Sequence, residues 1–423
     1  MLPTGHEDGS IHSLRVDVSD LLQRADLENS RINSAFTQAG EIGMTLTTVA
    51  GNATGPPADS PAQRVDPNTP AGGLYGGVVG IQSIDTFGLS YVCSGSVISP
   101  TFILTAAHCF DNNTSVTAAD GIPDGNIDPG STAIVTLNDG GNSTATINAV
   151  GITIHPSFNV VPAGSPGAVN GHDDLALVEL VTPVPAGTPI YPLHTSALTA
   201  SEHLYFAGYG KSGFGDVGVG DPLCGTAGGP ACPAGTVIPT LPIEVKRTGE
   251  NLAEFFVNDD EGIGNTGPQE LFLFDFDGPT DIAFFGGGTL GNDVESTIAL
   301  GDSGGPSFID SDPFQSGIQP AIAGVNTFTF EIGGADFGQY YQPSVGSNFL
   351  GTLGGGVVVD NYVDWLNSNI SVDLQLSAAV ASVTAGAGNV DSITYDVTVA
   401  NAGPAAATSV SIIDIFGLSL IHI

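Results

Sequence analysis

The chain has 423 residues, enough for roughly two to three domains on the usual size range. Its 44 acidic residues against 7 basic ones give a formal net charge of −37. A surface this negative cannot neutralise phosphates, which argues against nucleic acid and anionic membranes as partners. Apolar residues make up 41% of the chain, so most of it is expected to bury a core.

Residues 1–73 are predicted to be a leader or propeptide-like region with a linker. A short helical pattern over 17–29 begins after Ser19, a suitable N-cap, and residues 50–73 are rich in Gly, Pro, Asn, Ala and Asp. The first ten residues lack the basic and apolar segments of an export signal, and no apolar run is long enough to cross a bilayer. That absence does not make the protein cytoplasmic.

From Leu74 onward, short β-rich runs are separated by turn residues at intervals of about 8 to 12 residues. The runs at 78–81 and 133–137 are examples, and their pattern predicts an all-β sandwich or barrel. Helical periodicity appears at 359–366, where Val359, Tyr362, Val363 and Leu366 fall on one face. We therefore expect one helix at the end of this region.

Four cysteines permit three disulfide connectivities, and spacing alone does not choose among them. The local pairs Cys93–Cys109 and Cys224–Cys232 are favoured because each is close in sequence. No Cys-x-x-Cys spacing and no histidine near Cys224 or Cys232 supports zinc, so an oxidised, extracellular protein is expected.

Residues 371–423 show a strand pattern in which Tyr395, Val397 and Val399 alternate with polar positions. They resemble the immunoglobulin-like repeats that follow many secreted bacterial enzymes. The last eight residues, FGLSLIHI, do not continue this pattern. We expect a partial, truncated β-sandwich here.

The motif Gly-Asp-Ser-Gly-Gly-Pro at 301–306 is the first candidate for chemistry. A serine hydroxyl is a weak nucleophile at neutral pH, so Ser303 needs a base and an orienting acid from elsewhere in the chain. His108 follows an apolar strand and lies beside Cys109. Asp173 and Asp174 are the candidate acids, because a general-base imidazole must be held in one tautomer.

Three motifs resemble the chymotrypsin/trypsin family of serine endopeptidases: LTAAHC at 104–109, DLALVEL at 174–180 and GDSGGP at 301–306. They occur in the family's order of His, Asp and Ser, which separates it from subtilisin-like and α/β-hydrolase enzymes. The resemblance covers residues 74–370. It implies a chymotrypsin-like double β-barrel of two six-stranded barrels, with a C-terminal helix.

Carried over by motif, the resemblance makes His108 the general base, Asp174 the orienting acid and Ser303 the nucleophile. The backbone amides of Gly301 and Ser303 would form the oxyanion hole. Asp174 is chosen over Asp173 because the family places the acid directly before its Leu-Ala-Leu strand. Asp173 and His172 are then expected to be exposed turn residues.

The resemblance also suggests residues of the specificity pocket, namely Thr297, Asn326 and Phe328. Thr297 lies six positions before the serine, where selection for Lys or Arg would require an aspartate. A preference for an uncharged side chain is therefore expected, with Phe328 narrowing the pocket. Glu295 is a second source of negative charge nearby.

Many family members activate when a new amino terminus pairs with the aspartate before the serine, here Asp302. The sequence has no Ile-Val-Gly-Gly start. Cleavage between Arg64 and Val65 lies at a suitable distance before Cys93, so Val65 is the candidate terminus and the chain is expected to be a zymogen.

The insertion at 120–128 contains Asp120, Asp124 and Asp128 among turn glycines and resembles calcium-binding loops of extracellular proteins. It lacks a full EF-hand pattern, so an acidic surface turn is the alternative reading.

The sequence thus predicts a secreted, monomeric serine endopeptidase that acts on protein or peptide substrates and requires no cofactor, with structural calcium as an option. A catalytically idle homologue that serves as a surface-binding or adhesive module is the main alternative, because fold does not fix function. A calcium-stabilised structural protein is a third reading.

Overall fold

The structure is a computed structural model of the whole chain. It describes residues 47–50, 64–66, 73–84, 90–111, 126–128, 130–139, 142–158, 173–215, 218–219, 245–258, 268–278, 285, 288–291, 294–298, 301–309, 320–332, 342–343, 349–370, 374–385, 390–401, 411–413 and 420–422.

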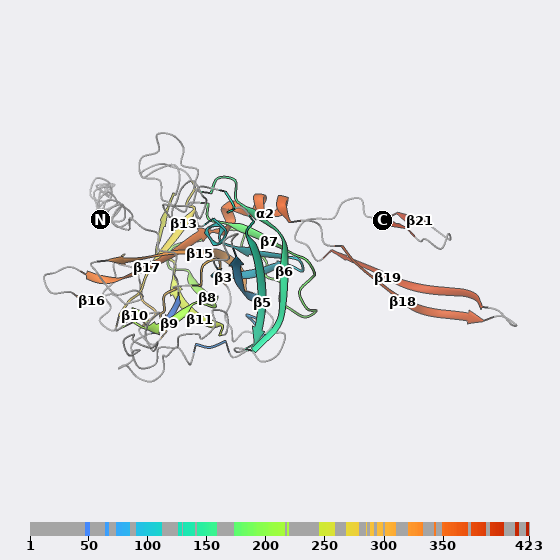
Figure 1. Cartoon of the computed structure of the whole chain (residues 1–423), viewed down its shortest axis with the longest axis horizontal. Helices are drawn as coiled ribbons and strands as arrows, with labels where there is room; N and C mark the ends of the chain where they lie inside the picture. Colours follow the sequence, from blue (N-terminus) through green and yellow to red (C-terminus); the bar gives the residue numbers. More distant parts are fainter. Residues whose placement is uncertain are drawn as a thin grey trace, which may run out of the picture. The chain divides into compact units, whose positions relative to one another are not determined.

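The first half of the domain is a closed barrel with the strand order β2-β3-β4-β7-β6-β5 (Figure 1). Its strands are β2 (Val78–Ile84), β3 (Ser90–Ser99), β4 (Phe102–Thr105), β5 (Thr132–Asp139), β6 (Asn142–Ile154) and β7 (Ala176–Leu180). The apolar runs predicted at 78–81 and 133–137 lie within β2 and β5. Fully buried side chains such as Val79, Ile81 and Ile103 form its core, as expected for strands that bury an apolar face.

The second half is an eight-stranded sheet, with the path β11-β8-β14-β15-β17-β13-β12 and β16 added to β17. Its strands are β8 (His203–Gly208), β11 (Arg247–Leu252), β12 (Phe255–Val257), β13 (Leu271–Asp275), β14 (Pro306–Ile309), β15 (Ala321–Ile332), β16 (Gln342–Pro343) and β17 (Phe349–Val358). Phe206, Phe272 and Phe274 are central to its core cluster. Together with the closed barrel it forms the predicted chymotrypsin-like double β-barrel.

The second half differs from a simple six-stranded barrel in how its two edges meet. The ladder is open between β11 and β13, and the short strand β12 extends the β13 edge. The side-chain amide of Asn251 spans this gap, because it donates to the carbonyls of Asp275 at 2.7 Å and Ser296 at 3.0 Å. The amide of Glu254 also donates to the carbonyl of Leu273 at 3.0 Å.

Two segments before residue 74 pair with strands, and the second of them, 64–66, lies within the linker expected for residues 50–73. Strand β1 (Thr47–Ala50) pairs in parallel with β9 (Lys211–Phe214), which also pairs with β10 (Gly218–Val219). Val65 forms a bridge with Arg247 at the free edge of β11. The helix predicted over 17–29 lies outside the described residues.

The predicted C-terminal helix is confirmed as a 3-10 turn, η2 (Val359–Tyr362), followed by α2 (Val363–Asn369). Val359, Tyr362 and Leu366 are buried, as their spacing requires. Among the described residues, no helix is long and apolar enough to span a membrane.

Beyond Ile370 the described chain forms two hairpins. Strand β18 (Leu374–Ala385) pairs antiparallel with β19 (Val390–Asn401), and β20 (Ser411–Ile413) pairs with β21 (Leu420–His422). The alternating segment that includes Tyr395 is therefore a strand, while the partial immunoglobulin-like sandwich and the domain boundary at 370 stay predictions.

Candidate active site

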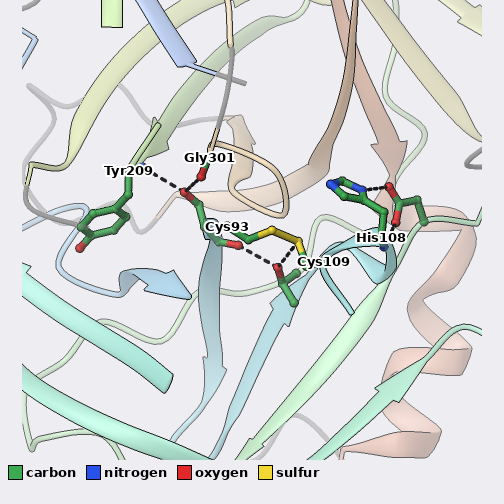
Figure 2. Close-up of a disulfide and its surroundings, with 8 residues drawn as sticks. Cys93, His108, Cys109, Tyr209 and Gly301 are labelled. Carbon is green, nitrogen blue, oxygen red and sulfur yellow. Dashed lines mark hydrogen bonds and ion pairs between the residues drawn. A yellow bond between two sulfur atoms is a disulfide. The ribbon is translucent and has the colours of Figure 1, made fainter. Parts of the chain in front are cut away.

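A disulfide holds the segment that carries His108 against the first barrel. Cys93 on β3 is bonded to Cys109 in the short helix η1 (Ala107–Cys109), as predicted, with an S–S length of 2.05 Å (Figure 2). Strand β4 ends at Thr105, so the chain turns into η1 at the end of an apolar strand. His108 is 7% exposed, which leaves the imidazole close to the surface but largely shielded from water.

Asp174 makes two hydrogen bonds to His108, one at each of its carboxylate oxygens. Oδ2 lies 2.5 Å from Nδ1 of His108, and Oδ1 accepts from the backbone amide of His108 at 2.8 Å (Figure 2). Asp174 is 2% exposed and directly precedes Leu175 and β7. A carboxylate held at both oxygens fixes the orientation of the ring, and it favours the tautomer with the proton on Nδ1.

Ser303 lies in a tight loop between two glycines with left-handed backbone angles, Gly301 at φ +98° and Gly304 at φ +78°. These angles are costly for residues with a Cβ, which explains the glycines. The amide of Gly304 donates to the carbonyl of Asn326 at 2.7 Å. Within the described residues, the amides of Gly301 and Ser303 are not engaged in a hydrogen bond.

The serine loop packs directly against the segment that leads to His108. A Cβ placed on Gly304 would overlap Oγ1 of Thr105 and lie 2.7 Å from the amide nitrogen of Ala106. Residue 304 is therefore in van der Waals contact with the chain two to three positions before His108. Ser303 and His108, which lie 195 positions apart in the printed sequence (303 minus 108), are brought to the same place.

Ser94 joins the serine loop to the first barrel and was not singled out from the sequence. Its Oγ donates to the carbonyl of Gly301 at 2.7 Å and accepts from the amide of Tyr209 at 2.9 Å (Figure 2). Its backbone amide donates to the carbonyl of Ser303 at 2.7 Å, and its carbonyl accepts from Thr105 Oγ1 at 2.8 Å. The position of Ser94 directly after Cys93 is the one feature of the sequence that could have indicated its role.

Asp173 corrects one expectation, because it is 5% exposed and not an exposed turn residue. Its carboxylate lies 3.3 Å from Nδ1 of His155, whose ring packs edge-on against Tyr362 and Trp365. Asp173 adopts a left-handed φ of +51°, and this turn directs the two adjacent carboxylates to different histidines. His172 lies outside the described residues.

The residues predicted for the specificity pocket have different surroundings. Thr297 is fully buried, and its Oγ1 makes no hydrogen bond to the residues that the structure describes. Asn326 faces β14, where its Oδ1 accepts from Ser307 Oγ at 2.7 Å. The ring of Phe328 lies over Gly355, because a Cβ there would come within 2.5 Å of it.

Glu295 is enclosed by its own loop. Its carboxylate accepts from the amides of Asp277 at 2.5 Å and Leu290 at 3.0 Å and from Thr289 Oγ1 at 3.0 Å. Burial raises the pKa of Glu295 to about 7, partly offset by these hydrogen bonds. Glu295 is therefore only partly ionised at neutral pH, and its carboxylate is buried.

Asp275, Asp277 and Glu295 form a buried carboxylate cluster whose oxygens lie within 4.8 Å of one another, close enough to hold a cation. Of the residues predicted for calcium, Asp128 is buried and its amide donates to the carbonyl of Phe110 at 2.9 Å. Asp120 and Asp124 lie outside the described residues, as does the predicted Cys224–Cys232 pair.

Glu254 lies near the carboxylates of this cluster, and its protonation reduces the repulsion between them. We therefore expect the stability of the protein to depend on pH through Glu254. Burial, followed by the charge of Asp275, raises the pKa of Glu254 to about 10. Because the pKa of Glu254 is higher in the folded state than in the unfolded state, the free energy of unfolding is not reduced by this group below about pH 4.5. It decreases as the pH rises from there toward 10. Glu254→Gln mimics the protonated form, so its Tm should fall less than that of the unmodified protein between pH 7 and 9.5.

Calorimetry at the two pH values checks this prediction. Glu179→Gln, at an exposed position on β7, is the control and should follow the unmodified protein. An equal loss of Tm in Glu254→Gln and the unmodified protein would contradict the assignment.

A protein family and a solved structure resemble parts of this chain. A sequence model of the trypsin family matches residues 74–220, a stretch that includes His108 and Asp174. A solved structure of HL collagenase matches at 17% identity, over 72% of this chain and 97% of that one, with a TM-score of 0.39. At that score the likeness adds nothing to what the strand pairing shows. Residues 74–220 are therefore similar in sequence to the trypsin family of serine proteases.

Proposed function

We propose that the protein is a serine endopeptidase that hydrolyses peptide bonds through an acyl-enzyme on Ser303. The observation that carries the proposal is the pair of hydrogen bonds that Asp174 accepts from His108, at a site where the serine loop packs against the chain that leads to His108. Acyl transfer by a serine requires a nucleophile, a base close to it and an acid that orients the base.

The roles follow from the hydrogen bonds. With its Nδ1 proton held by Asp174, His108 has Nε2 available to accept the hydroxyl proton of Ser303 as the oxygen attacks the scissile carbonyl. The proton then passes to the leaving amine, and the C–N bond breaks. Water attacks the ester in the second half of the reaction, again with His108 as the base.

The oxyanion hole is assigned to the amides of Gly301 and Ser303. Their freedom from hydrogen bonds within the described residues supports this role, because each donor must be available when charge develops on the carbonyl oxygen. The positive φ of Gly301 belongs to the conformation that presents its amide. The reaction needs no cofactor.

Substrates are proteins or peptides, with an uncharged residue preferred before the cleaved bond. Thr297 supplies no charge at the predicted pocket position, and Glu295 is bound by its own loop. The Cys93–Cys109 disulfide supports an oxidising, extracellular location. A monomer suffices, since all three catalytic groups come from one chain.

Degradation of casein tests this function. We expect peptide products, cleavage after uncharged residues by mass spectrometry, and loss of activity after treatment with a sulfonyl fluoride. Activity that survives this treatment would contradict the proposal. Absence of all cleavage would favour the idle, surface-binding homologue instead.

A further inference from the structure

Tyr209 and Gly210 connect β8 to β9, and this junction contacts the serine loop. The amide of Gly210 donates to Oδ1 of Asp302 at 3.0 Å. The amide of Tyr209 donates to Oγ of Ser94, the same hydroxyl that donates to the carbonyl of Gly301 (Figure 2). A Cβ on Gly301 would lie 3.1 Å from Cα of Gly210. The backbone of the junction is therefore packed against the loop that carries the serine.

Strand pairing holds the Tyr209–Gly210 junction on both sides. Before it, β8 pairs with β11 and β14 in the eight-stranded sheet. After it, β9 is the middle strand of a three-stranded sheet in the order β1-β9-β10 (Figure 1). The pairing with β1 begins directly after Gly210, with Thr47 opposite Lys211, and covers all four residues of β9, whereas β10 adds two residue pairs. In the described part of the chain, β1 thus provides most of the pairing of β9.

The sequence of β9 is a poor strand former by itself. Of its residues Lys-Ser-Gly-Phe, only Phe214 has a high strand propensity, whereas β1 reads Thr-Thr-Val-Ala. Ser212 is 1% exposed, so the backbone of β9 at this position cannot exchange a strand partner for water. An isolated pair of strands is at best marginally stable in water. We therefore expect β9, and the junction before it, to lose its fixed position when β1 is absent.

A second segment before residue 74 is also bound to the chain that follows β9. Residues 64–66 pair with 246–248 through two backbone hydrogen bonds of 2.8 and 2.9 Å. Asp66 and Lys246 form a buried ion pair at 3.3 Å. Val65 lies within this pairing, and its role as a new amino terminus stays a prediction. Both described segments before residue 74 are therefore paired with strands or strand edges of the region 211–248.

We propose that strand β1 is a positioning element of the active site. By pairing with β9 it holds the Tyr209–Gly210 junction, and through it the serine loop, in the conformation in which Ser303 reacts. The inference rests on the proposed function and deepens it, because it makes residues 47–50 a retained part of the enzyme and not a leader removed on maturation. Cleavage between Arg64 and Val65 then leaves an active protein only while β1 stays bound.

The first test disrupts the pairing in the full chain. In a strand, the N–H groups of adjacent residues point to opposite sides, so Thr48→Pro with Val49→Pro removes whichever one donates to β9. We expect kcat to fall about 100-fold with KM changed far less, because a misplaced nucleophile impairs chemistry more than binding. Two prolines in β18, Ser377→Pro with Ala378→Pro, are the control and should leave kcat within about threefold of the unmodified value. A kcat within about threefold in the β1 variant would overturn the inference.

A second test separates positioning from folding, because here the chain folds before β1 is detached. A recognition sequence for a site-specific protease is placed within 51–63, and the folded protein is cut and passed through a gel-filtration column in urea below the unfolding midpoint. A matched protein also carries Thr48→Cys and Ser212→Cys. These positions are directly opposite in the ladder, about 4.8 Å apart, which suits a disulfide that keeps β1 in place.

The two cut proteins should differ in their reaction with a fluorophosphonate. The protein with the added disulfide should keep a labelling rate within about threefold of the uncut chain. The protein without it should lose the fragment and about 100-fold in rate. Unchanged labelling after the fragment has left would overturn the inference. If the uncut chain never labels, the proposed function itself fails, a result distinct from labelling that does not depend on β1.

Discussion

Ser303→Ala is expected to lower kcat/KM for casein-derived peptides by at least about 10³-fold. The substitution removes the oxygen that forms the acyl-enzyme and leaves the loop glycines, the amides and the disulfide in place. His108→Ala should cause a loss of similar size, because the serine then has no base. The double variant should lose little more than either single one, since the two groups act as a unit.

Stopped assays on purified variants, with near-ultraviolet circular dichroism to confirm folding, check this prediction. Ser307→Ala is a matched control, because Ser307 is also a buried serine but its hydroxyl bonds to Asn326. It should lose some stability and retain kcat. A Ser303→Ala variant that cleaves peptides at the unmodified rate would rule out the acyl-enzyme.

Asp174→Asn is expected to lower kcat about 10⁴-fold, the size of loss seen when this acid is replaced in other Ser-His-Asp enzymes. An asparagine can still accept from the His108 amide through its oxygen. Its NH₂ group would then face Nδ1 as a donor and force the ring proton onto Nε2. His108 in that tautomer cannot accept the serine proton.

Asp173→Asn is the control for this substitution. Asp173 is the adjacent buried carboxylate, its φ of +51° is tolerated by asparagine, and it pairs with His155. Its kcat should stay within about threefold of the unmodified enzyme. Equal losses in both variants would indicate a general disturbance of the turn and would contradict the distinct roles of the two carboxylates.

The sequence predicted the part of the site that depends on residue type and order. His108, Asp174 and Ser303 stand in three motifs whose chemistry limits their neighbours, and the Cys93–Cys109 pair was favoured by its short spacing. The two glycines around Ser303 also follow from the motif, because the loop requires left-handed angles at both positions. These features are local, so a linear pattern records them.

Features that arise between distant strands could not be predicted in the same way. Ser94 has an ordinary side chain, and its bonds to Gly301 and Tyr209 exist only because β3 lies beside the serine loop. Asp173 was expected to be exposed because its polarity does not reveal that its carboxylate lies 3.3 Å from Nδ1 of His155.

Within the linker expected for residues 50–73, the described residues 64–66 are packed, and the sequence did not indicate this for a related reason. A Gly- and Pro-rich composition predicts a linker when few contacts are available, but Asp66 finds Lys246, which is fully buried and donates to the carbonyl of Tyr75 at 2.6 Å. In a chain with 7 basic residues, such a pair was hard to anticipate from composition.

Covalent labelling of the full chain with a fluorophosphonate tests the central claim most directly, because the probe reacts only with a serine activated by its base. Mass spectrometry should find the label on Ser303, at a rate that falls by about 10³-fold in His108→Ala. Label on another residue, or none on Ser303 in any form of the protein, would contradict the assignment of a serine endopeptidase.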